Sequence, residues 1–260
     1  MSDSLSYATA PGRFATHGIA HLPFAEQLLF ERFGRGCSRP VPYACIHHAF
    51  SDQVLRQPAA IAAQHGEVQI SYAELDHQAQ ALAAYLIQIG VRPGDHVGVF
   101  LQRSIAMLVS ILAVLKCGAA YVPLSTELPA ARVNYMAQAA DVSLVLSSSA
   151  LAAAYQWPAQ VPQLITDSAD FIQAVTQCDS QMPDYSQITA DSAAHVIFTS
   201  GSTGQPKGVA GTHLATVNRV LWMSGHYPFG QDEQCCHITS MAFTRAVWEL
   251  WLPLLSGQTL

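Results

Sequence analysis

From residue 45 onward, short apolar runs alternate with helical patterns, and this alternation most constrains what the chain can fold into. Four of the runs have the length of a strand: HVGVFL at 96–101, AAYVPL at 119–124, VSLVLS at 142–147 and AHVIF at 194–198. Runs that are apolar throughout are typical of strands covered on both faces, as in a parallel sheet. The sequence therefore predicts an α/β fold with a mostly parallel sheet flanked by helices.

Local signals place several elements. Ile46, Phe50 and Val54 recur at a helical spacing, and residues 59–71 resemble two short strands around a turn at 65–66. Ser71 and Glu74 form the S-x-x-E capping box that opens the next helix. Other segments are expected as helices at 24–33, 105–117, 130–139, 211–223 and 245–255, and as strands at 235–240 and from 258.

Composition narrows the class of protein. Of the 260 residues, 50% are hydrophobic and 12% are charged, and the net charge is −6. The basic residues are scattered, so we expect no nucleic-acid partner and no anionic-membrane surface. The N-terminus lacks the apolar segment of a signal peptide. The most apolar run, 105–115, is shorter than the roughly 20 residues of a membrane span. We therefore expect a cytoplasmic protein.

Six cysteines occur without a C-x-x-C pair or a spacing typical of zinc sites. The adjacent pairs Cys235–Cys236 and His47–His48 are expected to diverge, because neighbouring side chains on a strand or helix point apart. The sequence thus predicts reduced thiols and no metal site.

The segment VIFTSGSTGQPKGV, residues 196–209, contains the residue types expected to bind a ligand. Its glycines allow tight turns that present backbone N–H groups, its hydroxyls add donors, and Lys207 adds a positive charge. A loop between a buried parallel strand and a helix lies at the carboxyl edge of the sheet, where ligands bind. These groups suit a polyanion such as a nucleotide triphosphate, although the spacing is not that of the Walker loop. A ligand-free surface turn is the alternative.

Residues 198–209, FTSGSTGQPKGV, are similar to the phosphate-binding signature of the adenylate-forming (AMP-binding) enzymes. The SGSTG form resembles the amino-acid-adenylating domains of non-ribosomal peptide synthetases. Residues 44–260 resemble the N-terminal portion of such a domain, and residues 1–43 are similar to the linker that precedes it. Further segments resemble the family's motifs in the family's order: CIHHAFSDQVLRQP, ISYAEL, LAVLKCGAAYVPLSTELPAARVNYM, NRVLWM and FTRAVWELWLPLLSG.

The resemblance implies that ATP, Mg²⁺ and a carboxylic acid give an acyl-adenylate and pyrophosphate. The acyl group then passes to the phosphopantetheine thiol of a carrier domain, so carrier-protein or downstream synthetase domains are the expected partners. By motif position, Lys207 would be catalytic, stabilising charge on the leaving pyrophosphate. The ATP phosphates would be bound by Thr199, Ser200, Gly201, Ser202, Thr203, Gly204 and Gly208.

The substrate segment departs from the family pattern. Amino-acid-activating members have Asp just after the Phe that matches Phe243, whereas this chain has Thr244 followed by Arg245. An unpaired buried ammonium costs roughly 3–5 kcal/mol, so we expect an acid other than an ordinary α-amino acid, or a degenerate site. Trp248 is expected to line the same pocket, with core packing as the alternative, and Arg245 is alternatively a solvated helix-end residue.

The family's adenine-stacking segment, its ribose-binding Asp and its C-terminal lobe with the catalytic lysine have no match before Leu260. The chain is therefore expected to be an incomplete N-terminal lobe, truncated before these motifs and inactive by itself. Two other interpretations stay open: a catalytically dead nucleotide-binding or interaction module, and a fragment of an acyl-CoA ligase.

Overall fold

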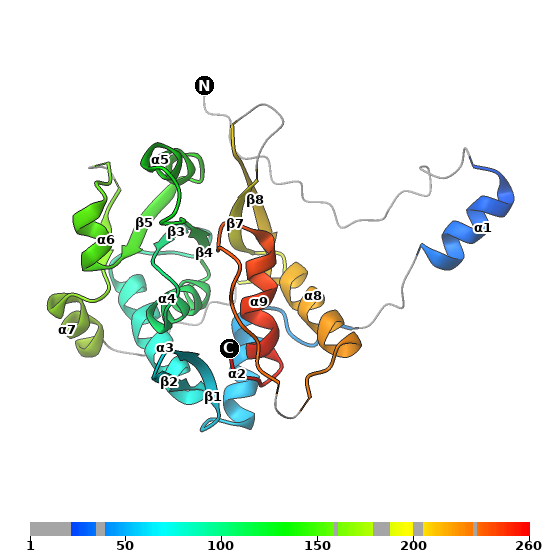
Figure 1. Cartoon of the computed structure of the whole chain (residues 1–260), viewed down its shortest axis with the longest axis horizontal. Helices are drawn as coiled ribbons and strands as arrows, with labels where there is room; N and C mark the ends of the chain where they lie inside the picture. The colour runs from blue at the N-terminus through cyan, green and yellow to red at the C-terminus, as the bar shows by residue number, and fades with distance from the viewer. Residues whose placement is uncertain (1–21, 35–39, 159–160, 179–187, 200–204, 231–232) are drawn as a thin grey trace. The chain divides into compact units, whose positions relative to one another are not determined.

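The computed structural model of the protein describes residues 22–34, 40–158, 161–178, 188–199, 205–230 and 233–260 (Figure 1). The chain divides into two compact units, Met1–Pro40 and Val41–Leu260. In the first unit, helix α1 covers Phe24–Phe33, where the sequence predicts a short helix. Several of its apolar side chains, Phe24 and Phe33 among them, are exposed.

A six-stranded sheet in the order β6-β5-β3-β4-β7-β8 forms the centre of the second unit. The strands β3, β4, β5, β6 and β7 are parallel to their neighbours in that order, and β8 is antiparallel to β7. This arrangement confirms the prediction of a mostly parallel sheet. The strand bounds are His96–Phe100 (β3), Ala120–Pro123 (β4), Val142–Ser147 (β5), Gln163–Ile165 (β6), Ala193–Thr199 (β7) and Lys207–Thr212 (β8).

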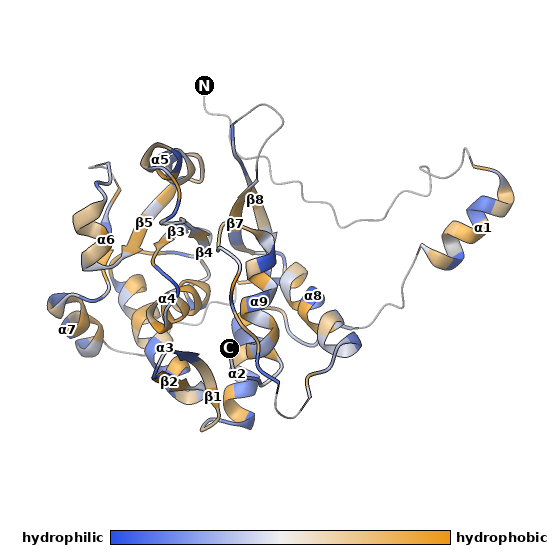
Figure 2. Cartoon of the chain, viewed as in Figure 1, coloured by the Kyte–Doolittle hydropathy of each residue, from blue (hydrophilic) through white to orange (hydrophobic). Residues whose placement is uncertain are grey.

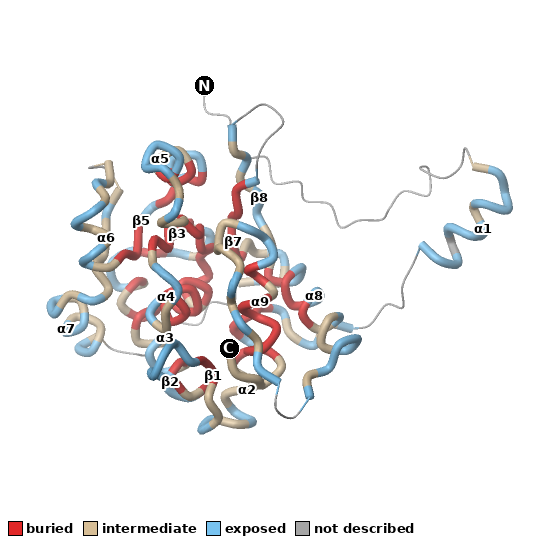
Figure 3. Tube along the Cα trace, viewed as in Figure 1, coloured by how far each residue is buried: buried red, intermediate tan, exposed pale blue. Residues whose placement is uncertain are grey.

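Helices cover both faces of the sheet, and a separate core cluster lies on each side. The larger cluster joins the strands to α2 (Ile46–Arg56), α3 (Tyr72–Gln88), α4 (Ile105–Lys116), α8 (His213–His226) and α9 (Thr244–Leu255). The smaller cluster lies under α5 (Ala130–Ala139), with Leu151 of α6 (Ser149–Ala154) packed against it. Figure 2 shows the apolar colouring of the central strands, and Figure 3 shows much of β7, α4 and α9 as buried.

Helix caps explain several of the boundaries. The Ser71 side chain accepts from the Glu74 backbone N–H, and the Glu74 carboxylate accepts from the Ser71 backbone N–H, which confirms the capping box. Ser104 caps α4 in the same way through the Met107 N–H. Gly118 follows α4 with φ +76°, a left-handed conformation that glycine adopts without strain.

A smaller antiparallel sheet pairs β1 (Ile61–His65) with β2 (Val68–Ser71), as predicted. The predicted strand at 258–260 is not regular, yet Leu260 bonds to β1: its N–H donates to the Ala62 carbonyl and its carbonyl accepts from the Gln64 N–H. The predicted strand at 235–240 is wrong. Residues 235–240 form one backbone bond with this end segment, from the Cys235 N–H to the Thr259 carbonyl, and without a ladder no strand forms.

The sequence missed four elements of the sheet region. Helix α6, strand β6 and helix α7 (Ala169–Gln177) lie in a stretch that has no clear pattern. Strand β8 occupies residues that were expected to belong to the loop and to the start of a helix. It is an edge strand with few buried residues, so it lacks the apolar run that would identify it. Helix α8 consequently begins at His213 and not near residue 211.

Two predictions about the protein's environment can be compared with the described residues. In the described part of the chain, Cys45, Cys117, Cys178, Cys235 and Cys236 form no disulfide bond. Among the residues that the structure describes, no helix combines the length and the hydropathy that crossing a bilayer requires.

Candidate nucleotide and acid site

The predicted phosphate-binding segment is a hairpin between β7 and β8, not the connection from a strand to a helix that the sequence suggests. Thr199 is paired with Lys207, and Phe198 with Gly208, at the loop end of the hairpin. The Thr199 hydroxyl donates to the Lys207 carbonyl at 3.5 Å. Ser200, Gly201, Ser202, Thr203 and Gly204 lie outside the described residues. The end of β7 still lies at the carboxyl edge of the parallel strands, as expected.

The loop end of the hairpin is held from two sides. The Tyr135 hydroxyl, on α5, donates to the Pro206 carbonyl at 3.3 Å. A Cβ at Gly208 would lie 3.1 Å from Val196 Cγ1 and 3.2 Å from Phe198 Cζ, closer than side chains normally approach. Glycine at this position therefore lets β8 lie directly against the side chains of β7.

Lys207 and Thr199 are both exposed, so the ammonium and the hydroxyl are free to meet a ligand from solvent. Lys207 is one of two lysines in the chain. The other, Lys116, is mostly buried and lies 3.0 Å from the Asp76 carboxylate. The structure thus places the less protected lysine beside the predicted loop.

The three predicted pocket residues, Thr244, Arg245 and Trp248, lie together on the first turns of α9 and line one cavity of about 510 Å³. Thr244 and Arg245 are exposed and Trp248 is half-buried. The cavity lies where α9, α8 and the hairpin meet, and no Asp or Glu is among its described lining residues. The others that line it are His195, Gly211, Ala215, Thr216, Arg219, Val220 and Val247.

His195 and Gly211 bring the hairpin into this cavity, since they are paired across β7 and β8. A Cβ at Gly211 would overlap the His195 ring, so the ring occupies the space that a side chain on β8 would need. Burial lowers the pKa of His195 to about 4, which keeps the ring neutral at physiological pH. Its Nδ1 is buried and has no hydrogen-bond partner.

Arg245 is not simply a solvated residue. Its Nε donates to Glu249 Oε1 at 2.8 Å, and its guanidinium lies 5.7 Å from the centre of the Trp248 ring. Glu249 is 2% exposed and also accepts from the Ile238 N–H, the Thr239 N–H and the Thr239 hydroxyl. Burial by itself raises the pKa of Glu249, but the hydrogen bonds from Thr239 and Ile238 and the charge of Arg245 bring it below its ordinary value.

Sequence reasoning did not single out Glu249, Arg219 or His195. Glu249 follows Arg245 by four residues on a predicted helix, a spacing that signals an ion pair. Arg219 lies in the NRVLWM segment, with its guanidinium over the Trp222 ring at 5.6 Å. Nothing in the pattern around His195 separates it from the apolar residues of β7.

A larger cavity of about 890 Å³ lies elsewhere, at the carboxyl ends of β3 and β4. Arg103 and Glu127 line it, together with Cys235 and His237 from the segment that precedes α9. None of the predicted site residues is among its described lining residues. The predicted residues therefore favour the smaller cavity, whereas volume alone favours the larger one. We assign the site by its chemistry, to the hairpin and the smaller cavity.

The family model described as AMP-binding enzyme matches residues 50–260. The dimodular nonribosomal peptide synthase of Bacillus subtilis (strain 168) is 36% identical over 208 residues, which is 80% of this chain and 9% of that protein. Malpibaldin synthetase of Mortierella alpina is 34% identical over 241 residues, covering 92% of this chain and 4% of the relative. The chain therefore spans less than a tenth of the length of these relatives.

Solved structures are similar over most of the chain. The AMPPNP-bound form of the nonribosomal peptide synthetase FmoA3 gives a TM-score of 0.80 at 26% identity, covering 91% of this chain and 24% of that one. The N-terminal subdomain of Klebsiella oxytoca NpsA in complex with 3-hydroxybenzoyl-AMSN gives 0.72 at 25% identity, covering 84% and 53%. The chain belongs to the AMP-binding enzyme family and resembles the N-terminal part of the adenylation domains of nonribosomal peptide synthetases.

Proposed function

We propose that these residues form part of a site that activates a carboxylic acid with ATP, as an acyl-adenylate for thioester formation in non-ribosomal peptide synthesis. The observation that carries this proposal is that one hairpin contributes residues both to the predicted phosphate-binding loop and to the cavity beside α9. Thr199 and Lys207 lie at its loop end, and His195 and Gly211 line the cavity. His195 and Thr199 are four residues apart on β7, or about 13 Å. A nucleotide bound by its phosphates at the loop would thus lie near an acid in the cavity.

In the proposed reaction, a carboxylate oxygen of the acid bonds to the α-phosphorus of ATP. The bond from that phosphorus to the bridging oxygen breaks, and pyrophosphate leaves with the electron pair. The Lys207 ammonium and the Thr199 hydroxyl act on the β- and γ-phosphates, where the negative charge increases. Mg²⁺ would be bound mainly by the phosphates, as is usual for this ion. Ser200, Gly201, Ser202, Thr203, Gly204 and Gly208 share the phosphate-binding role in this proposal.

The cavity favours an acid without an α-ammonium group. Thr244 accepts a hydrogen bond but cannot neutralise an ammonium, and Arg219 brings positive charge to the same cavity. The charge of Arg245 is offset by Glu249. Leaving a buried ammonium unpaired costs roughly 3–5 kcal/mol. Among the similar structures, NpsA is bound to a 3-hydroxybenzoyl analogue and FmoA3 to α-methyl-L-serine-AMP, so both kinds of acyl group occur on this fold.

The acceptor in this proposal is the phosphopantetheine thiol of a carrier domain. Support comes from the synthetase relatives and from a similar structure, an artificially fused adenylation–PCP di-domain of NpsA and ThdA, with a TM-score of 0.73 at 25% identity over 83% of this chain and 42% of that one. An acyl-CoA ligase would instead transfer the acyl group to the thiol of free coenzyme A.

A polypeptide of these 260 residues alone is proposed to bind ATP weakly and not to turn it over. Each hydrogen bond to a charged phosphate contributes about 1.5–3 kcal/mol, and association costs about 4–15 kcal/mol. Four to six such bonds contribute about 6–18 kcal/mol, which offsets most of that cost and leaves a dissociation constant on the order of 1 mM or weaker.

Carboxylate-dependent ATP–pyrophosphate exchange tests the proposal on the native polypeptide that contains these residues. A panel should pair each α-amino acid with its α-hydroxy and α-keto analogues. We expect exchange with an analogue that lacks the ammonium, and its loss in Lys207→Ala. Exchange selective for a standard L-amino acid would contradict the substrate class. Nucleotide binding with no exchange for any acid would favour a catalytically dead module.

A further inference from the structure

Three side chains with metal-binding atoms converge at the start of α2. Cys45 is the N-cap residue, and His47 and His48 follow in the first turn. One ligand atom from each of the three lies within 4.8 Å of those of the other two. The His47 and His48 rings meet edge to face with centroids 4.4 Å apart. The expectation that these adjacent histidines diverge is therefore wrong, because both rings fold toward the N-cap side chain.

Two of the three side chains, Cys45 and His47, have ligand atoms that make no strong hydrogen bond. His47 is 8% exposed, and its Nδ1 is buried without a hydrogen-bond partner. Buried polar atoms in folded proteins are rarely left unpaired, so this nitrogen calls for an explanation. Cys45 is fully buried, and its thiol makes a weak 3.7 Å contact with the Thr189 carbonyl. It makes no side-chain hydrogen bond as a helix cap.

The distances are close to those of a zinc site. Zn²⁺ binds cysteine sulfur at about 2.3 Å and histidine nitrogen at about 2.0–2.1 Å in a tetrahedral arrangement. Those lengths place neighbouring ligand atoms about 3.3–3.6 Å apart. Separations of up to 4.8 Å thus need to shorten by about 1.2–1.5 Å to match those of a zinc site.

We propose that Cys45, His47 and His48 bind a Zn²⁺ ion at the N-terminus of α2, independently of the nucleotide and acid site. One sulfur and two imidazole nitrogens are the ligand set that a borderline-soft d¹⁰ ion prefers. Binding replaces the S–H proton of Cys45 with the metal and releases that proton to solvent.

Neighbouring groups are compatible with this site. His213 packs against His47 with ring centroids 5.4 Å apart, and its Nδ1 accepts from the Ile46 N–H. The Nε2 atom of His213 then carries the proton and has no lone pair to offer the ion. A water molecule would therefore be the fourth ligand of the proposed zinc ion. Lys116 is the nearby cation, and the Asp76 carboxylate 3.0 Å away offsets its charge.

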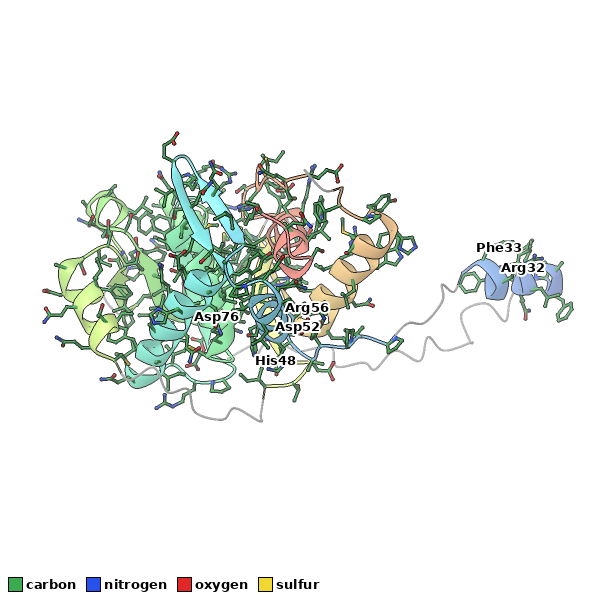
Figure 4. The ribbon with its side chains drawn as sticks, turned by 90° about the horizontal axis from the view of Figure 1, so that it is seen from below. Arg32, Phe33, His48, Asp52, Arg56 and Asp76 are labelled. Carbon is green, nitrogen blue, oxygen red and sulfur yellow. The ribbon has the colours of Figure 1, made fainter. Side chains whose placement is uncertain are left out.

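A path to solvent exists through His48, which is exposed. Figure 4 shows His48 on the outer side of α2, along the line of Asp52 and Arg56. Cys45 and His47 are buried, so an ion would enter from the side of His48. His48 can be replaced without disturbing a buried position.

Zinc titration of the 260-residue chain against a chromophoric chelator tests the proposal. We expect one Zn²⁺ per chain, with the dissociation constant raised more than about tenfold by His48→Gln and by Cys45→Ser. The matched controls are His77→Gln and Cys236→Ser, which replace an exposed histidine and an exposed cysteine elsewhere. Both controls should bind like the wild type.

Co²⁺ substitution gives a second readout that does not depend on affinity. A sulfur-to-cobalt charge-transfer band should appear in the wild type, disappear in Cys45→Ser and persist in Cys236→Ser. His48→Gln should fold like the wild type by circular dichroism, so loss of binding in that variant cannot be ascribed to unfolding. Binding that is unchanged in His48→Gln, or a cobalt complex without the charge-transfer band, would overturn the proposal.

Discussion

Arg245 and Glu249, one turn apart on α9, form an ion pair of 2.8 Å in which the carboxylate is buried and the guanidinium is largely exposed. The same carboxylate accepts from Thr239 and Ile238, which precede the helix. The buried Glu249 carboxylate therefore holds residues 238–239 against the first turns of α9 through hydrogen bonds.

Glu249→Gln should destabilise the fold by about 2–4 kcal/mol, because an amide turns one acceptor into a donor that faces other donors. Arg245→Ala should cost about 1 kcal/mol or less, since it removes one of four hydrogen bonds and exposes little. Urea unfolding monitored by tryptophan fluorescence measures both. Equal losses in the two variants would show that the carboxylate does not organise this segment.

Gly211→Ala should destabilise by about 1–3 kcal/mol, because the new methyl group overlaps the His195 ring. If that overlap is the cause, His195→Ala makes room for the methyl group. The double-mutant cycle should then give a coupling energy of about 1 kcal/mol or more. Additive losses would assign the cost of Gly211→Ala to the backbone instead of to the ring.

His195 should make stability fall with acidity. Its pKa is lowered to about 4 in the folded protein, whereas an unfolded histidine titrates near about 6.5. The unfolded state therefore binds the proton first, and stability declines as pH falls from about 6.5 to about 4. His195 should therefore lower the free energy of unfolding by about 2 kcal/mol at pH 5 relative to pH 7.

Denaturant unfolding at pH 7 and pH 5 checks this contribution. His195→Gln should reduce the dependence by this amount, while His47 and His213, whose pKa values burial also lowers, supply a remainder. His77→Gln, at an exposed position, should leave the dependence as in the wild type. A slope that is equally steep in His195→Gln would place the acid sensitivity elsewhere.

Much of the fold is predictable because each signal is local. The Ser71–Glu74 capping box and the wholly apolar β3 depend on neighbours in the sequence, and the predicted helix at 130–139 has the bounds of α5. Strand β8 was missed because an edge strand is held by hydrogen bonds to β7 and not by its own apolar residues.

The site was predictable only in part, for a similar reason. The sequence named Lys207 and Thr244, because their residue types suit the proposed chemistry. It did not show that His195 and Gly211 share the cavity with Thr244, because that contact depends on the register of β7 with β8. The contact of His47 with His48 depends on side-chain torsions at a helix start, which helical periodicity does not specify.

Thr244→Asp should shift the acid preference toward α-amino acids in the native polypeptide that contains these residues. A carboxylate at the start of α9 would pair with the substrate ammonium and recover part of the roughly 3–5 kcal/mol of an unpaired charge. Pyrophosphate exchange should rise for amino acids relative to their hydroxy analogues, and Thr244→Asn, which adds no charge, is the matched control. If both variants change the ratio alike, charge is not what selects the acid.

Polyphosphate protection of Lys207 is the most direct test of the central claim, that the β7–β8 hairpin binds the phosphates of a nucleotide. The acylation rates of Lys207 and Lys116 can be followed by peptide mass spectrometry, with Lys116, whose side chain is 11% exposed, as the internal reference. ATP and tripolyphosphate should slow acylation of Lys207 several-fold, with half the effect on the order of 1 mM. Arg56→Ala, which removes an exposed charge from α2, should keep this protection, and Thr199→Val should weaken it. A Lys207 rate that is unchanged by either polyphosphate would contradict the account.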